Sequence, residues 1–587
     1  MKGLDKKAEI LKQKMIGLKD KAATLKQSVT GLKNKPPLLF TAGTAALLIL
    51  GGGIAYWGVS HTLSQPGKLP AGMKLVPQDA VMTLSISAQE TQWTKLRQFG
   101  TPDTQRSFDN FLLKWRDQLL TVNGYQFKRD IKPWVGDEMT VIFLPVANPS
   151  GPDLETDVAI ILPIADRTKA KALMAEPKGT TRWVGRDYKG VQIQSVTTPT
   201  GETFETSVIG TDWVVVGQTP TAVEKIIDIS EGAASVLQTA GYRQAIPRID
   251  HPQAFAHLYI NLPAAKQLIE PSQGLPFGNS EGLAATVTLG NTGVNFKGTS
   301  WLAASDDNNY ADLKNTPDEM SRRVPDDALL MVSGNSLQKL WQDIGDANGA
   351  VPLLPFRPEN LKAGLQNATG LRMDEDLMPW MDGEFSFALL PPANQEQGSV
   401  DPGQLLLLVQ ASDRNAAEAT WKRLDDIIES RYGYEVKTIG TEEQIVTQWV
   451  SPFQGIAMSH GWLDGNVTFL GVGAEVADAI APRPKSALAE STLFQDLISE
   501  APKANTGHFF VDLAALNATE GMLPVPQLAP NSAAFTSAIQ AIGVTTTLHN
   551  DRTIDYDIQV ELAKTERSAE LPEGEGSKEG AESTPGN

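Results

Sequence analysis

The stretch PWVGDE at residues 133–138, followed by the strand-like run MTVIFLP, recurs as PWMDGE at 379–384, followed by FSFALLP. Two further pairs are VPQDA at 76–80 with VPDDA at 324–328, and HLYINLPA at 257–264 with HFFVDLAA at 508–515. The offsets between the copies are 246, 248 and 251 residues. Such steady spacing at three separate places indicates a duplication, and the period is far too long for a solenoid.

The paired motifs predict an α+β fold of two tandem homologous repeats, with largely antiparallel sheets and packed helices, preceded by one N-terminal transmembrane helix. Repeat 1 is expected at residues 76–303 and repeat 2 at residues 324–563, and a polar linker at 304–323 joins them. Each repeat has the usual length of a domain.

Apolar runs between turn residues predict the individual elements. A helix is expected where Phe108, Phe111, Leu112, Trp115 and Leu119 recur at helical spacing. Further helices are expected at 166–175 and 413–428. The expected strands and strand pairs lie at 139–144, 158–164, 191–196, 213–217, 255–262, 284–290 with 293–302, 404–411, and 542–548 with 553–562.

Ahead of the repeats, the run LLFTAGTAALLILGGGIAYWGVS at residues 38–60 holds no Asp, Glu, Lys or Arg. Its 23 residues would form a helix of about 34 Å, enough to cross a hydrocarbon core of about 30 Å. We therefore predict an uncleaved signal-anchor. The alternatives are a buried core helix and a cleaved signal peptide, although the run is long for a signal peptide and no small-residue cleavage site follows it.

Charge predicts the orientation of this anchor. Residues 1–35 contain ten Lys and three acidic residues, a net charge of +7, whereas the whole chain carries −18, so residues 36–587 carry −25. The positive-inside rule then places the N-terminus in the cytoplasm and the C-terminal part in the periplasm or thylakoid lumen. The acidic balance argues against nucleic acid as a partner of that part, and the absence of Cys agrees with an exported domain without disulfides.

The basic segment at residues 1–37 has Leu at every seventh position from Leu4 to Leu32, which predicts an amphipathic helix with a narrow apolar stripe. Three interpretations remain open: the helix lies on the anionic inner leaflet, pairs as a short coiled coil, or is a solvated topology signal. Residues 61–75 are expected to form a linker, and residues 564–587 a disordered acidic tail.

An anchor followed by VPxDA, by DIKPWVG at residues 130–136 and by Tyr188-Lys189-Gly190 resembles a known family. This family is uncharacterised, mostly cyanobacterial and membrane-anchored, and it is catalogued as a domain of unknown function of the 3352 series. The resemblance covers nearly all of residues 70–563, although the second copy exchanges Gly and Asp at 382–383. It implies an envelope or thylakoid location and supplies no catalytic residues.

Sequence motifs of catalysis, phosphate binding or metal binding are scarce in this sequence. Its six His have no metal-ligand spacing, there is no Cys, and no phosphate-binding loop or nucleophile motif is present. We therefore predict no catalytic, cofactor-binding or metal-binding residues and no cofactor.

Two pairs of carboxylates are the sharpest candidates for acid and base chemistry, Asp137 with Glu138 and Asp382 with Glu384. The alternative is that each Glu anchors the preceding turn beneath a Trp of the PW motif, Trp134 or Trp380. Recurrence in both copies favours this structural role.

Two further sets of side chains have a structural and a functional interpretation. His257 and His508 open equivalent strands, and we interpret both as structural. Trp449 and Trp462 flank an apolar stretch that could line a groove.

The function that we expect is that of a single-pass membrane protein whose duplicated exported part acts as a non-enzymatic scaffold or binding module for a protein partner. The first alternative is binding of a lipid, pigment or other apolar ligand near the membrane. The second is an envelope enzyme that uses the paired carboxylates. The sequence does not indicate an oligomeric state.

Overall fold

The computed structural model describes residues 69–119, 125–146, 156–175, 183–197, 203–267, 280–303, 310–311, 313–346, 358–392, 403–441, 444–452, 455–519 and 537–565. The chain divides into two compact units, Met1–Ala45 and Ala46–Asn587, and all of these residues belong to the second unit. The predicted basic segment, the transmembrane run at 38–60 and most of the acidic tail lie outside the described residues. Within the described ranges, no helix is long and apolar enough to span a membrane.

The first half of the described chain contributes ten strands to an antiparallel sheet, in the spatial order β4, β5, β6, β7, β3, β2, β1, β8, β9 and β10. Their bounds are β1 Met82–Ser87, β2 Glu138–Pro145, β3 Thr156–Pro163, β4 Trp183–Tyr188, β5 Val191–Thr197, β6 Thr203–Ile209, β7 Trp213–Gly217, β8 Ala256–Asn261, β9 Ser280–Leu289 and β10 Gly293–Leu302.

The second half contributes ten more strands in the order β15, β16, β17, β18, β14, β13, β12, β20, β21 and β22. Their bounds are β12 Leu330–Gly334, β13 Phe385–Leu390, β14 Gln404–Gln410, β15 Glu435–Thr441, β16 Gln444–Ser451, β17 Gly455–Leu463, β18 Val467–Val472, β20 Gly507–Asp512, β21 Ile539–Asn550 and β22 Thr553–Leu562. The short strands β11 (Thr316–Pro317) and β19 (Ala504–Asn505) form a separate pair.

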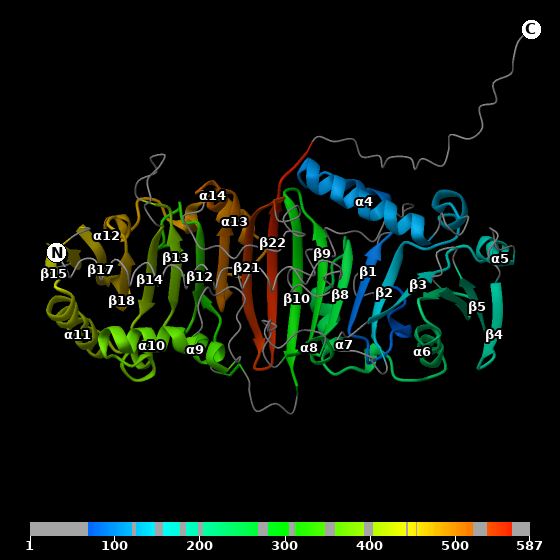
Figure 1. Cartoon of the computed structure of the whole chain (residues 1–587), viewed down its shortest axis with the longest axis horizontal. Helices are drawn as coiled ribbons and strands as arrows, with labels where there is room; N and C mark the ends of the chain where they lie inside the picture. Colours follow the sequence, from blue (N-terminus) through cyan, green and yellow to red (C-terminus); the bar gives the residue numbers. More distant parts are fainter. Residues whose placement is uncertain are drawn as a thin grey trace, which may run out of the picture. The chain divides into compact units, whose positions relative to one another are not determined.

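The two halves meet where β10 pairs with β22, from Gly293 opposite Glu561 to Trp301 opposite Thr553. The twenty strands therefore form one continuous sheet, with β10 and β22 side by side at its middle (Figure 1). Counted outward from this junction, the strands of the second half follow the same order of connection as those of the first. The sequence predicted two tandem repeats and made no prediction about strand pairing between them. In the structure, the last strands of the two halves pair.

The helices of the first half are α3 Glu90–Leu96, α4 Pro102–Leu119, α5 Arg167–Ala175, α6 Pro220–Ser230, α7 Tyr242–Ile249 and α8 Leu262–Lys266. Those of the second half are α9 Leu337–Asp346, α10 Pro358–Thr369, α11 Arg414–Tyr432, α12 Val476–Ile480, α13 Thr492–Ile498 and α14 Leu513–Ala518. Local sequence explains their ends: Asp413 caps α11 by accepting from the Ala416 backbone N, and Gly433, with φ of 69°, ends it.

One face of the sheet carries a hydrophobic core in each half. In the first half, Ile142, Ile161 and Val215 of the sheet pack with Ile226 and Ile227 of α6. In the second half, the same face carries Leu406, Leu408 and Phe469, with Phe494 and Leu497 of α13. Burial of these side chains stabilises the fold by about 1.5–3 kcal/mol for each large residue.

Three predicted linker or tail segments extend into the fold. Met73 and Leu75 of the expected linker 61–75 are buried in the first core. Within the expected linker 304–323, β11 pairs with β19. At the start of the expected tail, the backbone N of Thr565 donates to the carbonyl oxygen of Gln98. Residues of all three segments therefore belong to the described fold.

Candidate functional site

The two glutamates of the PW motifs anchor chain segments that lie far away in the sequence. Glu138 Oε2 accepts a hydrogen bond from the Ala71 backbone N at 2.9 Å. Glu384 Oε1 accepts one from the Glu319 backbone N at 3.0 Å. Burial raises the pKa of Glu384. Both glutamates thus tie the segment that leads into the VPxDA motif of their half.

The neighbouring aspartates make contacts of their own. Asp382 is exposed and accepts from Ser336 Oγ at 2.7 Å. That serine caps α9, because its Oγ accepts from the Lys339 backbone N at 3.0 Å. The backbone oxygen of Asp137 accepts from the Ala88 backbone N at 2.6 Å.

Each PW motif follows a single π-helical turn, which spans Phe127–Ile131 in the first half and Met373–Leu377 in the second. The indole Nε1 of Trp134 donates to the Asp130 carbonyl at 2.8 Å, and that of Trp380 donates to the Asp376 carbonyl at 3.1 Å.

The aspartate carboxylates close these same turns. Asp130 Oδ2 accepts from the Gln126 backbone N at 2.7 Å, and Asp376 Oδ2 accepts from the Arg372 backbone N at 2.6 Å. Both Trp side chains are buried. In both halves, the motif therefore forms a turn whose Asp carboxylate binds a backbone N–H of the same turn, and whose Trp side chain is buried against it.

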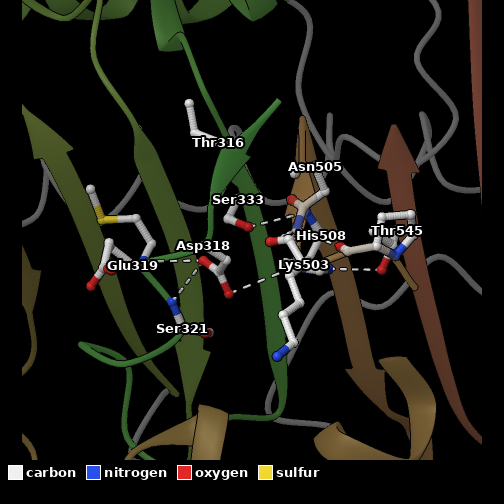
Figure 2. Close-up of polar contacts among 12 residues, drawn as sticks. Thr316, Asp318, Glu319, Ser321, Ser333, Lys503, Asn505, His508 and Thr545 are labelled. Carbon is white, nitrogen blue, oxygen red and sulfur yellow. Dashed lines mark hydrogen bonds and ion pairs between the residues drawn. The ribbon is translucent and has the colours of Figure 1, made fainter. Parts of the chain in front are cut away.

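His508 lies in a polar network of the second half (Figure 2). Its Nδ1 is 2.9 Å from Thr545 Oγ1, its Nε2 is 3.1 Å from Asn505 Nδ2, and its Nε2 is 3.6 Å from Asp318 Oδ2. Its backbone N donates to Ser333 Oγ at 3.1 Å. In the neutral tautomer with its proton on Nδ1, the ring donates to Thr545 Oγ1 and accepts from the Asn505 amide.

This order of carboxylate, imidazole and hydroxyl is also that of a hydrolase triad. Here the hydroxyl belongs to Thr545, which is 1% exposed, so it has no access to a substrate. Burial lowers the pKa of His508 more strongly than Asp318 raises it, which favours the neutral ring. The network fastens β20 to β21 and to the segment around Asp318.

His257 occupies the corresponding place in the first half. Its Nδ1 lies 3.1 Å from the hydroxyl of Thr286, its partner residue on β9. Burial lowers its pKa to about 4, against an ordinary value of 6.5. Both histidines therefore contact a buried threonine of the adjacent strand, and burial favours the neutral form of both rings.

The tryptophans expected to border a groove lie beneath α11. Trp449 is buried, and its Nε1 donates to Asp425 Oδ1 at 2.7 Å. His460 Nε2 contacts the same oxygen at 2.8 Å, and its ring stacks on Trp421 at 4.5 Å. The ring of Trp462 is half-buried, with the Arg414 guanidinium 4.2 Å from its centre. Sequence spacing gave no signal for the Asp425–His460 contact.

In the part of the chain that the structure describes, no group of three or more His, Asp or Glu side chains is placed to hold a metal ion. The Glu, His and Trp candidates from the sequence are thus distributed over separate local contacts, and the structure does not bring them into one site.

A different feature distinguishes the two halves, a row of directly paired apolar residues on the sheet face opposite the cores. We call the set in the second half the second-half row: Leu407, Phe387, Val332, Phe509, Val544 and Ile558. Phe387 is 37% exposed, and the other five side chains are half-buried. None of the six carries a charge or a hydrogen-bonding group.

The same positions in the first half form the first-half row: Ile160, Val141, Leu84, Leu258, Ala285 and Gly298. Val141 is 0% exposed, whereas its counterpart Phe387 is 37% exposed. Leu84, Leu258 and Ala285 are also buried, and their counterparts Val332, Phe509 and Val544 are not. The second half thus presents an apolar face that the first half closes.

Helices pack near both rows. In the second half, Leu407 packs against the cluster on which Leu337 and Trp341 of α9 also pack, and Phe509 packs against the cluster that contains Leu516 of α14.

In the first half, Trp93 of α3 packs edge-on against Phe255 at 4.8 Å, and Phe108 of α4 is buried. In Figure 1, α4 runs along the upper ends of the first-half strands. In the second half, the short helix α14 covers one end through Leu516, which packs with Leu329 and Val511.

These features define a mixed protein of helices and one long antiparallel sheet, with a partly exposed apolar row in its second half. The chain belongs to the family described as "Protein of unknown function (DUF3352)", whose model matches residues 41–562. None of the curated protein sequences matches it.

Among solved structures, the chain is similar to crystal forms I and III of TP0453. Form I has 10% sequence identity and a TM-score of 0.23 over 43% of this chain and 83% of TP0453. Form III has 11% identity and a TM-score of 0.21 over 40% and 81%, respectively. At these TM-scores the likeness carries no argument about fold or function.

Proposed function

We propose that this protein is a single-pass membrane protein whose exported part is a non-enzymatic binding module, and that the second-half row is its binding surface. The observation that carries the proposal is the contrast between Val141, which is fully buried, and Phe387, which is 37% exposed at the corresponding position. Soluble folds normally bury contiguous apolar faces, and a face left open is typical of an interaction site.

We also propose that the two halves are homologous repeats. Their strand orders correspond, and their repeated motifs make matching contacts: Val236 N donates to the Val76 carbonyl, as Leu488 N does to that of Val324. Because motifs shared by both halves serve the fold, a function specific to one half is best sought where the halves differ.

Structural roles for the paired carboxylates support a non-enzymatic module. Glu138 and Glu384 both hold backbone N–H groups of entry segments, and this shared task explains why both copies keep them. The proposal of an envelope enzyme would need a second role for these groups.

The membrane part of the proposal rests on the sequence, with its uncharged run at 38–60, its basic N-terminal segment and its acidic C-terminal part. The periplasm or thylakoid lumen of a cyanobacterial cell is the expected location of the module. A lipid, pigment or other apolar ligand is the second candidate occupant, because the second-half row offers only apolar contacts.

The test compares the full chain with two variants in membranes of the expressing host. Phe387→Ser should abolish a stoichiometric complex that survives mild detergent, and Ile439→Ser, which changes an exposed apolar residue elsewhere, should retain it. Deletion of residues 38–60 should release the chain from carbonate-washed membranes. A wild-type chain that is monodisperse and free of any partner would contradict the binding module.

A further inference from the structure

We infer that His508 is a protonation switch, whose ring binds Asn505 of β19 when it is neutral and Asp318 when it is protonated. Asp318 belongs to the connecting segment, residues 313–323, which leads from the first half into the second. Two different side chains therefore lie near the same ring nitrogen, Nε2 (Figure 2). The switch is independent of the second-half row.

In the neutral state, Nε2 of His508 accepts from the Asn505 amide at 3.1 Å. The Nδ2 group of Asn505 also lies 3.5 Å from the Pro502 carbonyl oxygen and 3.4 Å from that of Lys503. Because carbonyl oxygens only accept hydrogen bonds, these contacts orient the amide with its N–H groups toward Nε2. The contact between the amide and the ring thus requires that Nε2 carries no proton.

A second proton on the ring changes the partner of Nε2. An N–H group at Nε2 points at the N–H groups of Asn505, and two donors repel each other. Asp318 offers an acceptor instead, because its Oδ2 lies 3.6 Å from Nε2. A shift of about 1 Å brings this pair to the usual length of a charge-assisted hydrogen bond. Protonation thus exchanges a contact with β19 for a contact with the connecting segment.

The carboxylate of Asp318 is held in place by its own turn. Its Oδ1 accepts from the backbone N of Met320 at 3.1 Å and from that of Ser321 at 3.2 Å, while Oδ2 faces the ring. The side chain of His508 is 3% exposed and that of Asp318 is 13% exposed. The ion pair of the protonated state therefore forms largely away from bulk water, where attraction between charges is strong.

The other described groups in contact with the ring of His508 and its backbone N are neutral. Thr545 of β21 contacts Nδ1, Ser333 of β12 accepts from the backbone N, and Phe494 of α13 packs edge-on at 5.8 Å. Burial lowers the pKa of His508 from its ordinary value of 6.5, and the charge of Asp318 opposes this shift. The ring therefore takes its second proton below pH 6.5.

Further charged groups surround Asp318. Burial raises the pKa of Glu384, and the negative charges of Asp318 and Glu319 add to the rise. A positive ring at His508 reduces the repulsion among these carboxylates, which favours the protonated state of the switch. The side chain of Lys503, near β19, is exposed.

Loss of the contact with Asn505 weakens the attachment of β19 to the connecting segment. Asn505 pairs with Thr316 of β11, and its carbonyl oxygen accepts from Asn335 Nδ2 at 3.3 Å. Thr316 Oγ1 donates to Asn335 Oδ1 at 3.0 Å. These three residues hold the short strands β11 and β19 together, so this pair should open more readily when His508 is protonated.

The first half has a corresponding histidine without these two partners. The positions that correspond to Asn505 and Asp318 are Ala254 and Pro70, whose side chains neither donate nor accept hydrogen bonds. The switch is therefore specific to the second half, and His257 provides the matched control.

The test measures hydrogen–deuterium exchange of the full chain in detergent at about pH 7.5 and about pH 5, with rates corrected for the chemical effect of pH. Wild-type peptides that cover 313–317 and 502–507 should lose protection about fivefold or more at the lower pH. His508→Gln, which cannot take the proton, should keep this protection, and His257→Gln should respond as the wild type does. Asp318→Asn should move the response to lower pH, because it removes the charge that favours the protonated ring.

An equal loss of protection in the wild type and in His508→Gln would overturn the inference, as would an unchanged response in Asp318→Asn. Loss of the response in His257→Gln would place the switch in the first half and would also overturn it. Peptides of β10 report on opening of the whole fold, and an equal loss of protection there would contradict a local switch. Asp318→Asn keeps the test decisive if His508→Gln does not fold, because Asp318 lies outside the strands of the sheet.

Discussion

Phe387 of β13 stands directly opposite Val332 of β12, and both side chains are partly open to solvent on an uncharged sheet face. Their counterparts Val141 and Leu84 are paired in the same way and are buried. Two surfaces with the same strand pairing thus have opposite exposure. The predictions below test this contrast and the structural roles of the repeated motifs.

Truncating a side chain of the row should destabilise the protein more in the first half than in the second. Val141→Ala leaves a cavity in a closed core and should destabilise the protein by about 2–3 kcal/mol. Phe387→Ala removes more atoms, but from a partly solvated site, and should cost about 1 kcal/mol. Shifts in the thermal unfolding midpoint of the full chain measure both. A larger loss for Phe387→Ala would show that this face is closed.

Replacing either glutamate should lower the free energy of unfolding by a similar amount. Glu138→Ala and Glu384→Ala each leave a backbone N–H without its acceptor, which costs about 1–3 kcal/mol. Asp382→Ala, at an exposed position, should change stability by about 0.5 kcal/mol or less. Urea denaturation of the three variants makes the comparison. A neutral effect at Glu138 or Glu384 would remove the structural explanation for their repetition.

The indole N–H of each PW motif should contribute separately from its ring. Trp134→Phe and Trp380→Phe keep most of the buried ring and lose one hydrogen bond, for about 1–2 kcal/mol. Trp134→Ala and Trp380→Ala should cost about 3–5 kcal/mol. If Phe and Ala variants unfold at the same temperature, the ring does not seal the turn.

Acid should destabilise the fold through its buried histidines. Burial lowers the pKa of His257 to about 4 from 6.5. Between these values the unfolded chain binds a proton that the folded chain does not, so stability is complete above pH 6.5 and falls as the pH drops toward 4. The loss is about 3 kcal/mol at most.

His257→Gln should flatten that part of the pH profile of the unfolding midpoint. The difference between wild type and variant isolates His257 from Glu384, whose raised pKa acts with the opposite sign by favouring the fold at low pH. An identical slope in the two proteins would place the acid sensitivity elsewhere.

The sequence predicted much of the fold because its signals are local. Short apolar runs marked β2, β3 and β14, and helical spacing marked α4 and α11, which the structure contains. The pairing of β10 with β22 left no such signal, because nothing local specifies which strands lie side by side across 250 residues of chain.

The candidate site was less accessible to sequence reasoning. The carboxylates could be seen as anchors because they recur, but their partners Ala71 and Glu319 lie outside the repeated motifs. The second-half row escaped notice for a physical reason. Phe385 and Phe387 lie on the same face of one strand, yet Phe385 is buried and Phe387 is 37% exposed, and only tertiary packing decides this difference.

The most direct test of the open face uses the absence of Cys in this chain. Phe387→Cys and Val141→Cys each introduce a single thiol at corresponding positions, and their rates of reaction with a maleimide report exposure in the full chain. We predict that the thiol at position 387 reacts at least a hundredfold faster than the thiol at position 141. Equal rates at the two positions, or a faster reaction at position 141, would contradict the account.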